Sequence, residues 1–119
     1  MDDIKKFPAY TITATLQGAA NRRDELCEVC DLPFIKFSGG CCGTAVWKGA
    51  RLLDVLKSAG FDDMRDDGPV QHVLFEGLDT GPAGSLYSVS IPIQKAMDHY
   101  GDVLLAYEMN GEPLTQDHG

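Results

Sequence analysis

The sequence has little positive charge and no long apolar run. Of its 119 residues, 10 are Lys or Arg and 18 are Asp or Glu, which gives a formal net charge of −8. A surface of this sign repels nucleic-acid phosphates. No apolar stretch approaches the ~20 residues of a membrane-spanning helix, and the opening MDDIKK lacks the apolar centre of a signal peptide. We therefore expect neither nucleic acid nor membrane as a partner.

The chain also lacks internal repeats and Pro- or Ser-rich linkers. Its length corresponds to about one domain. Hydrophobic residues make up 44% and charged residues 24%, as in ordinary globular chains rather than disordered ones. We expect a single folded unit that is long enough to bury a core.

The cysteines do not form a spread-out disulfide framework, because all four lie within one short stretch: Cys27, Cys30, Cys41 and Cys42. A bond within the vicinal pair would be strained, so we expect free thiols and a reducing compartment. The alternative is a zinc site with Cys27 and Cys30 as one knuckle. Such a site needs a second spaced pair, for which adjacent cysteines are a poor substitute, and we favour buried or idle thiols.

Hydrophobic periodicity predicts a mixture of strands and short helices. Period-two alternation with β-branched residues predicts a strand at 10–16, followed by a loop. Apolar residues at helical spacing before Gly60 predict a helix that ends there. The remaining patterns predict strands at 45–47, 70–75, 86–91 and 103–109, helices at 24–30 and from 92 to about 101, an irregular segment at 32–43, and loops at 61–68 and 79–85.

The last predicted strand, 103–109, is strongly apolar and is followed by Asn110-Gly111, which favours a tight hairpin. Such a strand needs partners on both edges. We expect the chain either to be cut off or to need another chain, with marginal folding and a tendency to aggregate. The alternative is that residues 112–114 form a short edge strand and stop.

Several ordered motifs resemble the sulfite oxidase and eukaryotic nitrate reductase family. The segment LQGAANRR at 16–23 follows the first strand and is similar to that family's signature, LQCAGNRR. The further matches follow in the same order along nearly the whole chain: TAVWKGARL with DVL at 44–56, FEGLD at 75–79, SIP at 90–92, LLAYEMNG at 104–111 and DHG at 117–119. The match is somewhat closer to sulfite oxidase than to nitrate reductase.

The resemblance implies an α+β, mixed-sheet molybdopterin-binding oxidoreductase domain that is incomplete over residues 1–119. The N-terminal cofactor loop, the C-terminal half and its dimerisation domain are expected to be absent. The family's cofactor is molybdenum held by a pterin dithiolene, and its reaction oxidises sulfite to sulfate by oxygen-atom transfer. The implied partners are sulfite, a cytochrome-type electron acceptor and, at full length, a second copy. The animal members suggest the mitochondrial intermembrane space, although no targeting segment is visible.

The resemblance also implies roles for individual residues. Arg23 matches an arginine near the substrate anion, and a guanidinium fork suits an oxyanion. Asn21 and Arg22 match neighbouring cofactor-binding positions. Asp79 matches an aspartate that accepts from the pterin N–H groups, and His118 matches a histidine near the cofactor phosphate. We expect the turn after the first strand and Asp79 to face one shared hollow.

One departure from the signature bears directly on the chemistry. Gly18 occupies the place of the cysteine whose thiolate binds molybdenum. Another cysteine could replace it, but Cys27 lies nine positions further on, in a different segment, which argues against rescue. We therefore expect impaired catalysis. The alternatives are a non-catalytic fragment or pseudoenzyme, and a nitrate reductase-like fragment.

Overall fold

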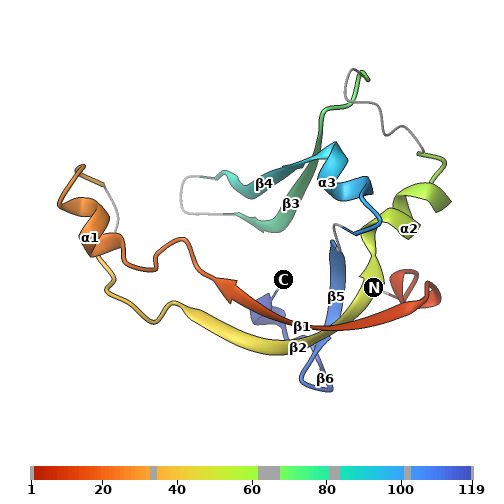
Figure 1. Cartoon of the computed structure of the whole chain (residues 1–119), viewed down its shortest axis with the longest axis horizontal. Helices are drawn as coiled ribbons and strands as arrows, with labels where there is room; N and C mark the ends of the chain where they lie inside the picture. Colours follow the sequence, from red (N-terminus) through yellow and green to blue (C-terminus); the bar gives the residue numbers. More distant parts are fainter. Residues whose placement is uncertain (1, 33–34, 62–67, 81–83, 101–102, 119) are drawn as a thin grey trace.

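The computed structural model describes residues 2–32, 35–61, 68–80, 84–100 and 103–118. Figure 1 shows two separate sheets, with the short helices Leu52–Ser58 and Ile93–Met97 where the sheets meet and the helix Arg23–Cys27 at the opposite end of the molecule. The elements in chain order are η1 (Ile4–Lys6), β1 (Ala9–Gln17), α1 (Arg23–Cys27), β2 (Cys42–Arg51), α2 (Leu52–Ser58), β3 (His72–Thr80), β4 (Leu86–Pro92), α3 (Ile93–Met97), β5 (Leu104–Met109), β6 (Glu112–Pro113) and η2 (Gln116–His118).

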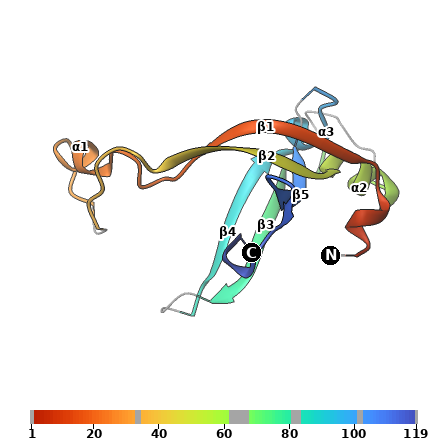
Figure 2. The same cartoon turned by 90° about the horizontal axis from the view of Figure 1, so that it is seen from below.

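The larger sheet has the strand order β1-β2-β5-β6, and all its pairs are antiparallel. β1 and β2 pair in one unbroken register from Ala9 opposite Ala50 to Gln17 opposite Cys42. The two strands form a long curved hairpin that ends in α1, away from the rest of the molecule in both views (Figures 1 and 2). This hairpin is the arm of the structure.

Gly49 allows the arm to join the rest of the sheet. The register between β2 and β5 shifts at Lys48/Gly49. A Cβ at position 49 would lie 2.2 Å from the Leu105 carbonyl oxygen, which is far inside van der Waals contact. A side chain is excluded because two backbones meet there. The Trp47 indole donates from Nε1 to the Ala14 carbonyl oxygen at 3.2 Å and ties β2 to β1.

The core lies between α2, α3 and the smaller antiparallel sheet of β3 and β4. Helical spacing places apolar side chains of α2 and α3 on facing sides. α2 is followed by Gly60 in the left-handed conformation, with φ of 85°, as expected of a glycine C-cap. The central cluster consists of five buried residues: Leu52, Leu53, Ile93, Ala96 and Met97.

The folded chain is unusually open for its size. Its accessible surface is 8750 Å², whereas a compact monomer of this mass exposes ~6300 Å². Its radius of gyration is 16.8 Å, against about 13.5 Å for a compact domain of this length. Part of the exposed surface is apolar, since Leu78 and Tyr87 are 99% and 78% exposed. The two sheets enclose a concave side that this chain does not fill.

Most predicted elements are present, with several differences in extent. β2 is much longer than the predicted 45–47, because its whole length pairs with β1. Asp79 and Thr80 were expected in a loop but belong to β3, because Thr80 pairs with Leu86. α3 ends at Met97, before the predicted position. The predicted acidic loop at 62–67 and the helix end near 101 lie outside the described residues.

The α+β class is confirmed. Both sheets are antiparallel over the described strands, so the mixed pairing expected from the resemblance does not occur there. β5 lies between β2 and the two-residue β6. This is the alternative in which the residues after the hairpin turn form a short edge strand. Within the described residues, no helix is long and apolar enough to cross a membrane.

We expect the isolated chain to self-associate through its concave side. Burying an exposed apolar side chain contributes ~1.5–3 kcal/mol, so replacing Leu78 and Tyr87 together by Ser should weaken association roughly tenfold or more. Sedimentation equilibrium over a range of protein concentrations measures this. Leu74→Ser is the matched control, because Leu74 is 63% exposed on the opposite face of β3 from Phe75. A wild-type chain that stays monomeric and unfolds cooperatively would contradict the prediction.

Candidate functional site

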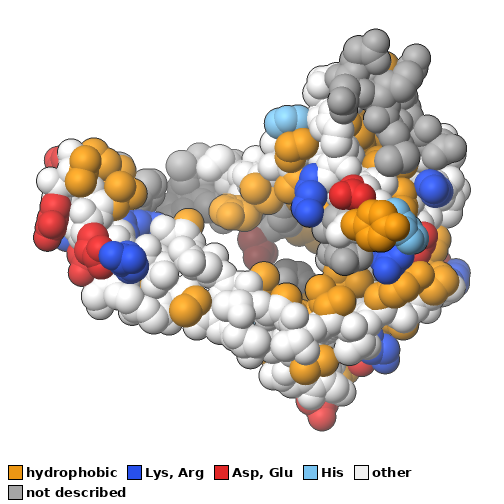
Figure 3. All heavy atoms as spheres, in the orientation of Figure 1, with side chains coloured by type: hydrophobic (Ala, Val, Ile, Leu, Met, Phe, Trp, Pro, Cys, Tyr) orange, Lys and Arg blue, Asp and Glu red, His pale blue; other side chains and the backbone are white. Residues whose placement is uncertain are grey.

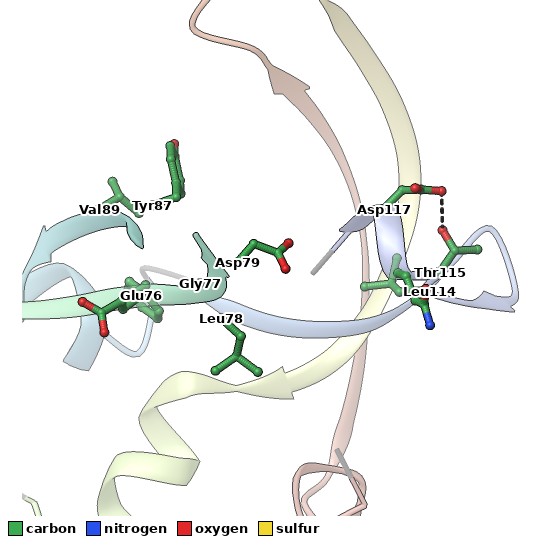
Figure 4. A pocket seen from close by; sticks show the side chains of 11 residues that line it. Glu76, Gly77, Leu78, Asp79, Tyr87, Val89, Leu114, Thr115 and Asp117 are labelled. Atoms are coloured by element: carbon green, nitrogen blue, oxygen red, sulfur yellow. Dashed lines mark hydrogen bonds between the residues drawn. The ribbon is translucent and has the colours of Figure 1, made fainter. Parts of the chain in front are cut away.

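An open cavity of about 850 Å³ lies on the concave side, between the β3–β4 sheet and the segment that follows β6. Figure 3 shows the molecule hollowed between the arm and this sheet. Asp79 projects into the cavity towards Asp117 and Thr115, whereas Glu76 points away from both (Figure 4). The lining residues are Phe75, Glu76, Gly77, Leu78, Asp79, Tyr87, Val89, Leu114, Thr115, Gln116 and Asp117.

A bulge in β3 directs Asp79 into this cavity. Glu76 pairs with Ser88, but the next pair is Thr80 with Leu86. Three residues of β3 therefore face only Tyr87 of β4. Such an excess bends a strand and redirects its side chains. The glycine of FEGLD belongs to this bulge, which explains why the motif lies within a strand and still presents an acid.

The chemistry of the cavity is that of hydrogen-bond acceptors beside apolar walls. Asp79 and Asp117 line it with carboxylates, whereas the Glu76 side chain points away from both. An ionised carboxylate accepts hydrogen bonds without donating any. Tyr87 and Val89 supply apolar surface on one side. The cavity therefore suits a flat ligand that is rich in N–H groups, and it repels a phosphate or sulfite anion.

His118 lines a second, mostly apolar cavity of about 450 Å³. Its other lining residues come from β1, β2, β5 and the segment after β6: Ile12, Ala14, Leu16, Trp47, Leu104, Ala106 and Leu114. Nδ1 of His118 lies 3.2 Å from the Thr115 hydroxyl oxygen. The two cavities share Leu114, so Asp79 and His118 line adjoining hollows. Leu16, two residues before Gly18, belongs to the second hollow.

The turn after β1 is fixed by hydrogen bonds to the segment that leads into β2. The Gly18 amide donates to the Cys41 carbonyl oxygen at 2.7 Å, and the Arg22 amide donates to the Ser38 carbonyl oxygen at 3.0 Å. The Asn21 side-chain oxygen accepts from the Cys41 amide at 3.1 Å. Asn21 therefore holds the backbone of the neighbouring segment.

Arg22 is engaged within the turn. Its backbone is left-handed, with φ of 58°, a conformation uncommon for a residue with a side chain. Its guanidinium donates to both carboxylate oxygens of Glu25, from Nε at 2.7 Å and also from Nη2. These hydrogen bonds lower the pKa of the Glu25 carboxyl and raise the pKa of Arg22. The pair largely neutralises the charge of Arg22.

Arg23 begins α1 and differs from its neighbour. Its Nη1 donates to the Ile35 carbonyl oxygen at 3.3 Å. A guanidinium carries five N–H donors in a planar fork, which suits paired hydrogen bonds to an oxyanion.

The predicted site residues thus fall into two groups. Asp79 and His118 line adjoining cavities, whereas Asn21, Arg22 and Arg23 lie at the far end of the arm (Figures 1 and 2). The described lining of the Asp79 cavity includes no residue of the 18–23 turn. The 18–23 turn and Asp79 therefore do not line one shared hollow in this structure, because the arm extends past β3 and β4 without packing on them.

Sequence reasoning missed several residues of the site. Tyr87, Thr115 and Asp117 line the Asp79 cavity, although none was singled out as a site residue. For Asp117, its place beside His118 in the DHG motif was the available signal. Tyr87 had none, because its role depends on the β3–β4 register. Among the described residues, no three of His, Cys, Asp or Glu gather as a metal site, which gives the zinc alternative no support.

The Arg22–Glu25 pair predicts a pH dependence of the turn. Because the pKa of Glu25 is lower in the folded chain, the pair stabilises α1 above the unfolded-state pKa and is lost as pH falls through the folded-state value. Carbon-13 NMR of the Glu25 carboxyl should therefore show a midpoint below the ordinary glutamate value. Arg22→Gln should return it to that value, and equal midpoints in the two proteins would contradict the prediction.

Comparisons with known proteins agree with this architecture. The family model for the oxidoreductase molybdopterin binding domain matches residues 1–119. Mitochondrial sulfite oxidase of Homo sapiens is 50% identical over 119 residues, covering 100% of this chain and 21% of that protein. NADH nitrate reductase 1 of Oryza sativa subsp. japonica is 44% identical over 124 residues, covering 100% of this chain and 13% of that protein.

A solved structure shows the same fold. The crystal structure of the sulfane dehydrogenase SoxCD from Paracoccus pantotrophus matches with a TM-score of 0.68 and 28% identity, over 99% of this chain and 27% of that chain. The chain spans about a fifth of the length of human sulfite oxidase. Since the family model covers every residue, the chain belongs to the family of oxidoreductase molybdopterin binding domains.

Proposed function

We propose that this chain binds a molybdenum–pterin cofactor and serves sulfite oxidation. The observation that carries the proposal is the Asp79 cavity, in which a carboxylate on a bulged strand faces a polar segment across an open hollow. Family membership supports the cofactor class. Relatives named for sulfite oxidation support the substrate, with identities near 50%.

The residues of the cavity fit the pterin part of the cofactor. Pterin rings present several N–H donors along one edge, and the Asp79 carboxylate offers acceptors in the middle of the hollow. Tyr87 and Val89 provide apolar surface for the face of a flat ring. Thr115 already donates to Asp117 at 3.4 Å, which leaves Asp79 as the carboxylate that meets the ring.

The anionic groups belong elsewhere. The carboxylates of the Asp79 cavity repel phosphate, so the cofactor phosphate lies towards His118 in the adjoining hollow. Arg23 binds the substrate anion, because it matches the arginine that lies near the anion in the family and because a planar guanidinium fork suits an oxyanion. Asn21 acts by holding the turn rather than by touching the cofactor, because its oxygen is used by the Cys41 amide.

When bound, the cofactor supplies the two-electron oxidation that carries sulfite to sulfate. The residues of this chain bind and orient the cofactor and neutralise the charge of the substrate anion. Position 18 offers no thiolate, so we expect turnover well below that of a protein with the complete signature. A cytochrome-type electron acceptor, association with a second copy and a mitochondrial location are part of the same proposal.

A second candidate function is a cofactor-binding module without turnover, and Gly18 favours it. The backbone at Gly18 is not left-handed, and its environment has room for a Cβ. Nothing in the fold therefore requires glycine there, so the missing thiol is a chemical change rather than a structural necessity. A nitrate reductase-like role rests on the rice relative at 44% identity.

Co-expression with the molybdenum cofactor pathway tests the main proposal. The purified chain should contain molybdenum and pterin in equal amounts and reduce ferricyanide when sulfite is added. Molybdenum without sulfite-dependent reduction would favour the binding module. Reduction of nitrate to nitrite by a reduced viologen dye, without sulfite-dependent reduction of ferricyanide, would favour the nitrate reductase-like role. Absence of both metal and pterin would overturn the proposal.

Replacing Asp79 should weaken pterin binding. A hydrogen bond to a charged group contributes about 1.5–3 kcal/mol, so Asp79→Asn should lower the affinity for an uncharged pterin roughly 10- to 100-fold. Fluorescence titration of the pterin measures this. Glu28→Gln is the charge-matched control, because Glu28 is exposed near α1. Equal affinities of wild type and Asp79→Asn would show that Asp79 does not bind the pterin.

A further inference from the structure

β1 is an edge strand, and among the described strands only β2 pairs with it. It stands first in the strand order β1-β2-β5-β6. It also belongs to the arm, which leaves the rest of the molecule in both views (Figures 1 and 2). The edge of a sheet carries a row of N–H and C=O groups that can pair with another strand. The edge of β1 that faces away from β2 is called the free edge below.

Alternate residues of β1 direct their backbone groups to the free edge. In an antiparallel pair, opposed residues that exchange both hydrogen bonds alternate with opposed residues that exchange none. The Gly18 amide donates to the Cys41 carbonyl oxygen one step beyond the ladder, so the even-numbered residues of β1 are bonded to β2. The odd-numbered residues, which are all exposed, present their N–H and C=O groups outwards: Ala9, Thr11, Thr13, Thr15 and Gln17.

Two hydrogen bonds of β2 agree with this assignment. Val46 lies opposite Thr13. Its carbonyl oxygen accepts from the Asn110 amide at 2.7 Å, and its amide donates to Asn110 Oδ1 at 2.9 Å. Both backbone groups of Val46 therefore point away from β1, and Thr13 presents its own pair on the free edge.

The free edge lacks the features with which sheet edges usually prevent pairing, which are short length, charge, proline and bulges. The other edges of the described sheets have them. β6 has two residues and includes Pro113, β3 has a register shift and two carboxylates, and β4 ends at Pro92. β1 has nine residues without charge or proline, and its register is unbroken.

The sequence of β1 is complementary to itself. When two copies run antiparallel with Thr13 opposite Thr13, Thr11 lies opposite Thr15 on the same face. On the other face apolar residues oppose each other, Tyr10 opposite Leu16 and Ile12 opposite Ala14. Cross-strand pairs of both kinds stabilise sheets. No two like charges meet along β1, although the chain has a net charge of −8.

This register also satisfies the outward backbone groups along the whole strand. Odd-numbered residues oppose odd-numbered residues, so each outward N–H meets an outward C=O of the second copy. A shift by one residue would oppose threonines to apolar residues, and a shift by two would leave one end of each strand unpaired. Before Ala9 the ladder has no donor, because Pro8 lacks an N–H and the Phe7 amide donates to the Ile4 carbonyl oxygen.

We propose that the free edge of β1 pairs with the same edge of a second copy of this chain, antiparallel and centred on Thr13. The two copies then share one continuous sheet across a two-fold axis, and their apolar faces, which include Ile12 and Leu16, become continuous. The surface is distinct from the concave side, where Leu78 and Tyr87 lie. The inference goes beyond the proposed function, because backbone pairing requires no cofactor.

Amide hydrogen exchange of the purified chain at increasing protein concentration measures this pairing residue by residue. The outward amides of Thr11, Thr13 and Thr15 should exchange roughly tenfold or more slowly at high concentration. The amides of Ile12 and Ala14 are the internal control, because they are bonded to β2 at every concentration. Outward amides whose exchange does not depend on concentration would overturn the inference, even where the chain associates through its concave side.

Replacing Thr13 separates the backbone from the side chain. Thr13→Pro removes an outward N–H but no hydrogen bond to β2, so two hydrogen bonds are lost from each dimer and association should weaken roughly tenfold or more. Thr13→Ala keeps the N–H and is the matched control, expected within about threefold of the unmodified strand. Sedimentation equilibrium in the Leu78→Ser, Tyr87→Ser background excludes the concave side. Equal association of the two variants would contradict pairing at this edge.

Cross-linking determines the register. In a chain whose four natural cysteines are replaced by Ser, Thr13→Cys should cross-link to itself through a short bis-maleimide. Ala9→Cys and Gln17→Cys should cross-link when mixed but not separately, because identical positions lie ~26 Å apart across the axis at ~3.3 Å per residue. Cross-linking of Ala9→Cys to itself would indicate parallel strands and overturn the inference. None of these results depends on molybdenum or pterin, so the proposed function is tested separately.

Discussion

The antiparallel register of β1 and β2 is the constraint on which the rest of the structure depends. It starts at Ala9 opposite Ala50, where β2 meets the core, and runs without a bulge to Gln17 opposite Cys42. An error of one residue would exchange the two faces of the arm. Gly49 permits the close approach to β5 at one end, and the Gly18 amide continues the pairing at the other. The position of every side chain in the signature turn therefore follows from this one ladder.

Local sequence patterns predicted which segments form strands and turns better than they predicted how far those strands extend and how they pair. Alternation identified β1, and the turn residues Asn110 and Gly111 both adopt positive φ, 53° and 86°, as the hairpin required. The length of β2 was not visible, because glycine and cysteine carry no strand signal and are ordered here by pairing with β1. The bulge that presents Asp79 was equally hidden, since it depends on how β3 and β4 align.

The distribution of charge divides the candidate site into two chemistries. Carboxylates line the hollow beside β3 and β4, and both signature arginines lie at the far end of the arm. An acidic protein that binds an anion must keep the anion apart from its own carboxylates, because carboxylates in the same cavity would repel it. The proposed binding of a pterin beside Asp79 and of a separate substrate anion at Arg23 agrees with this division of charge.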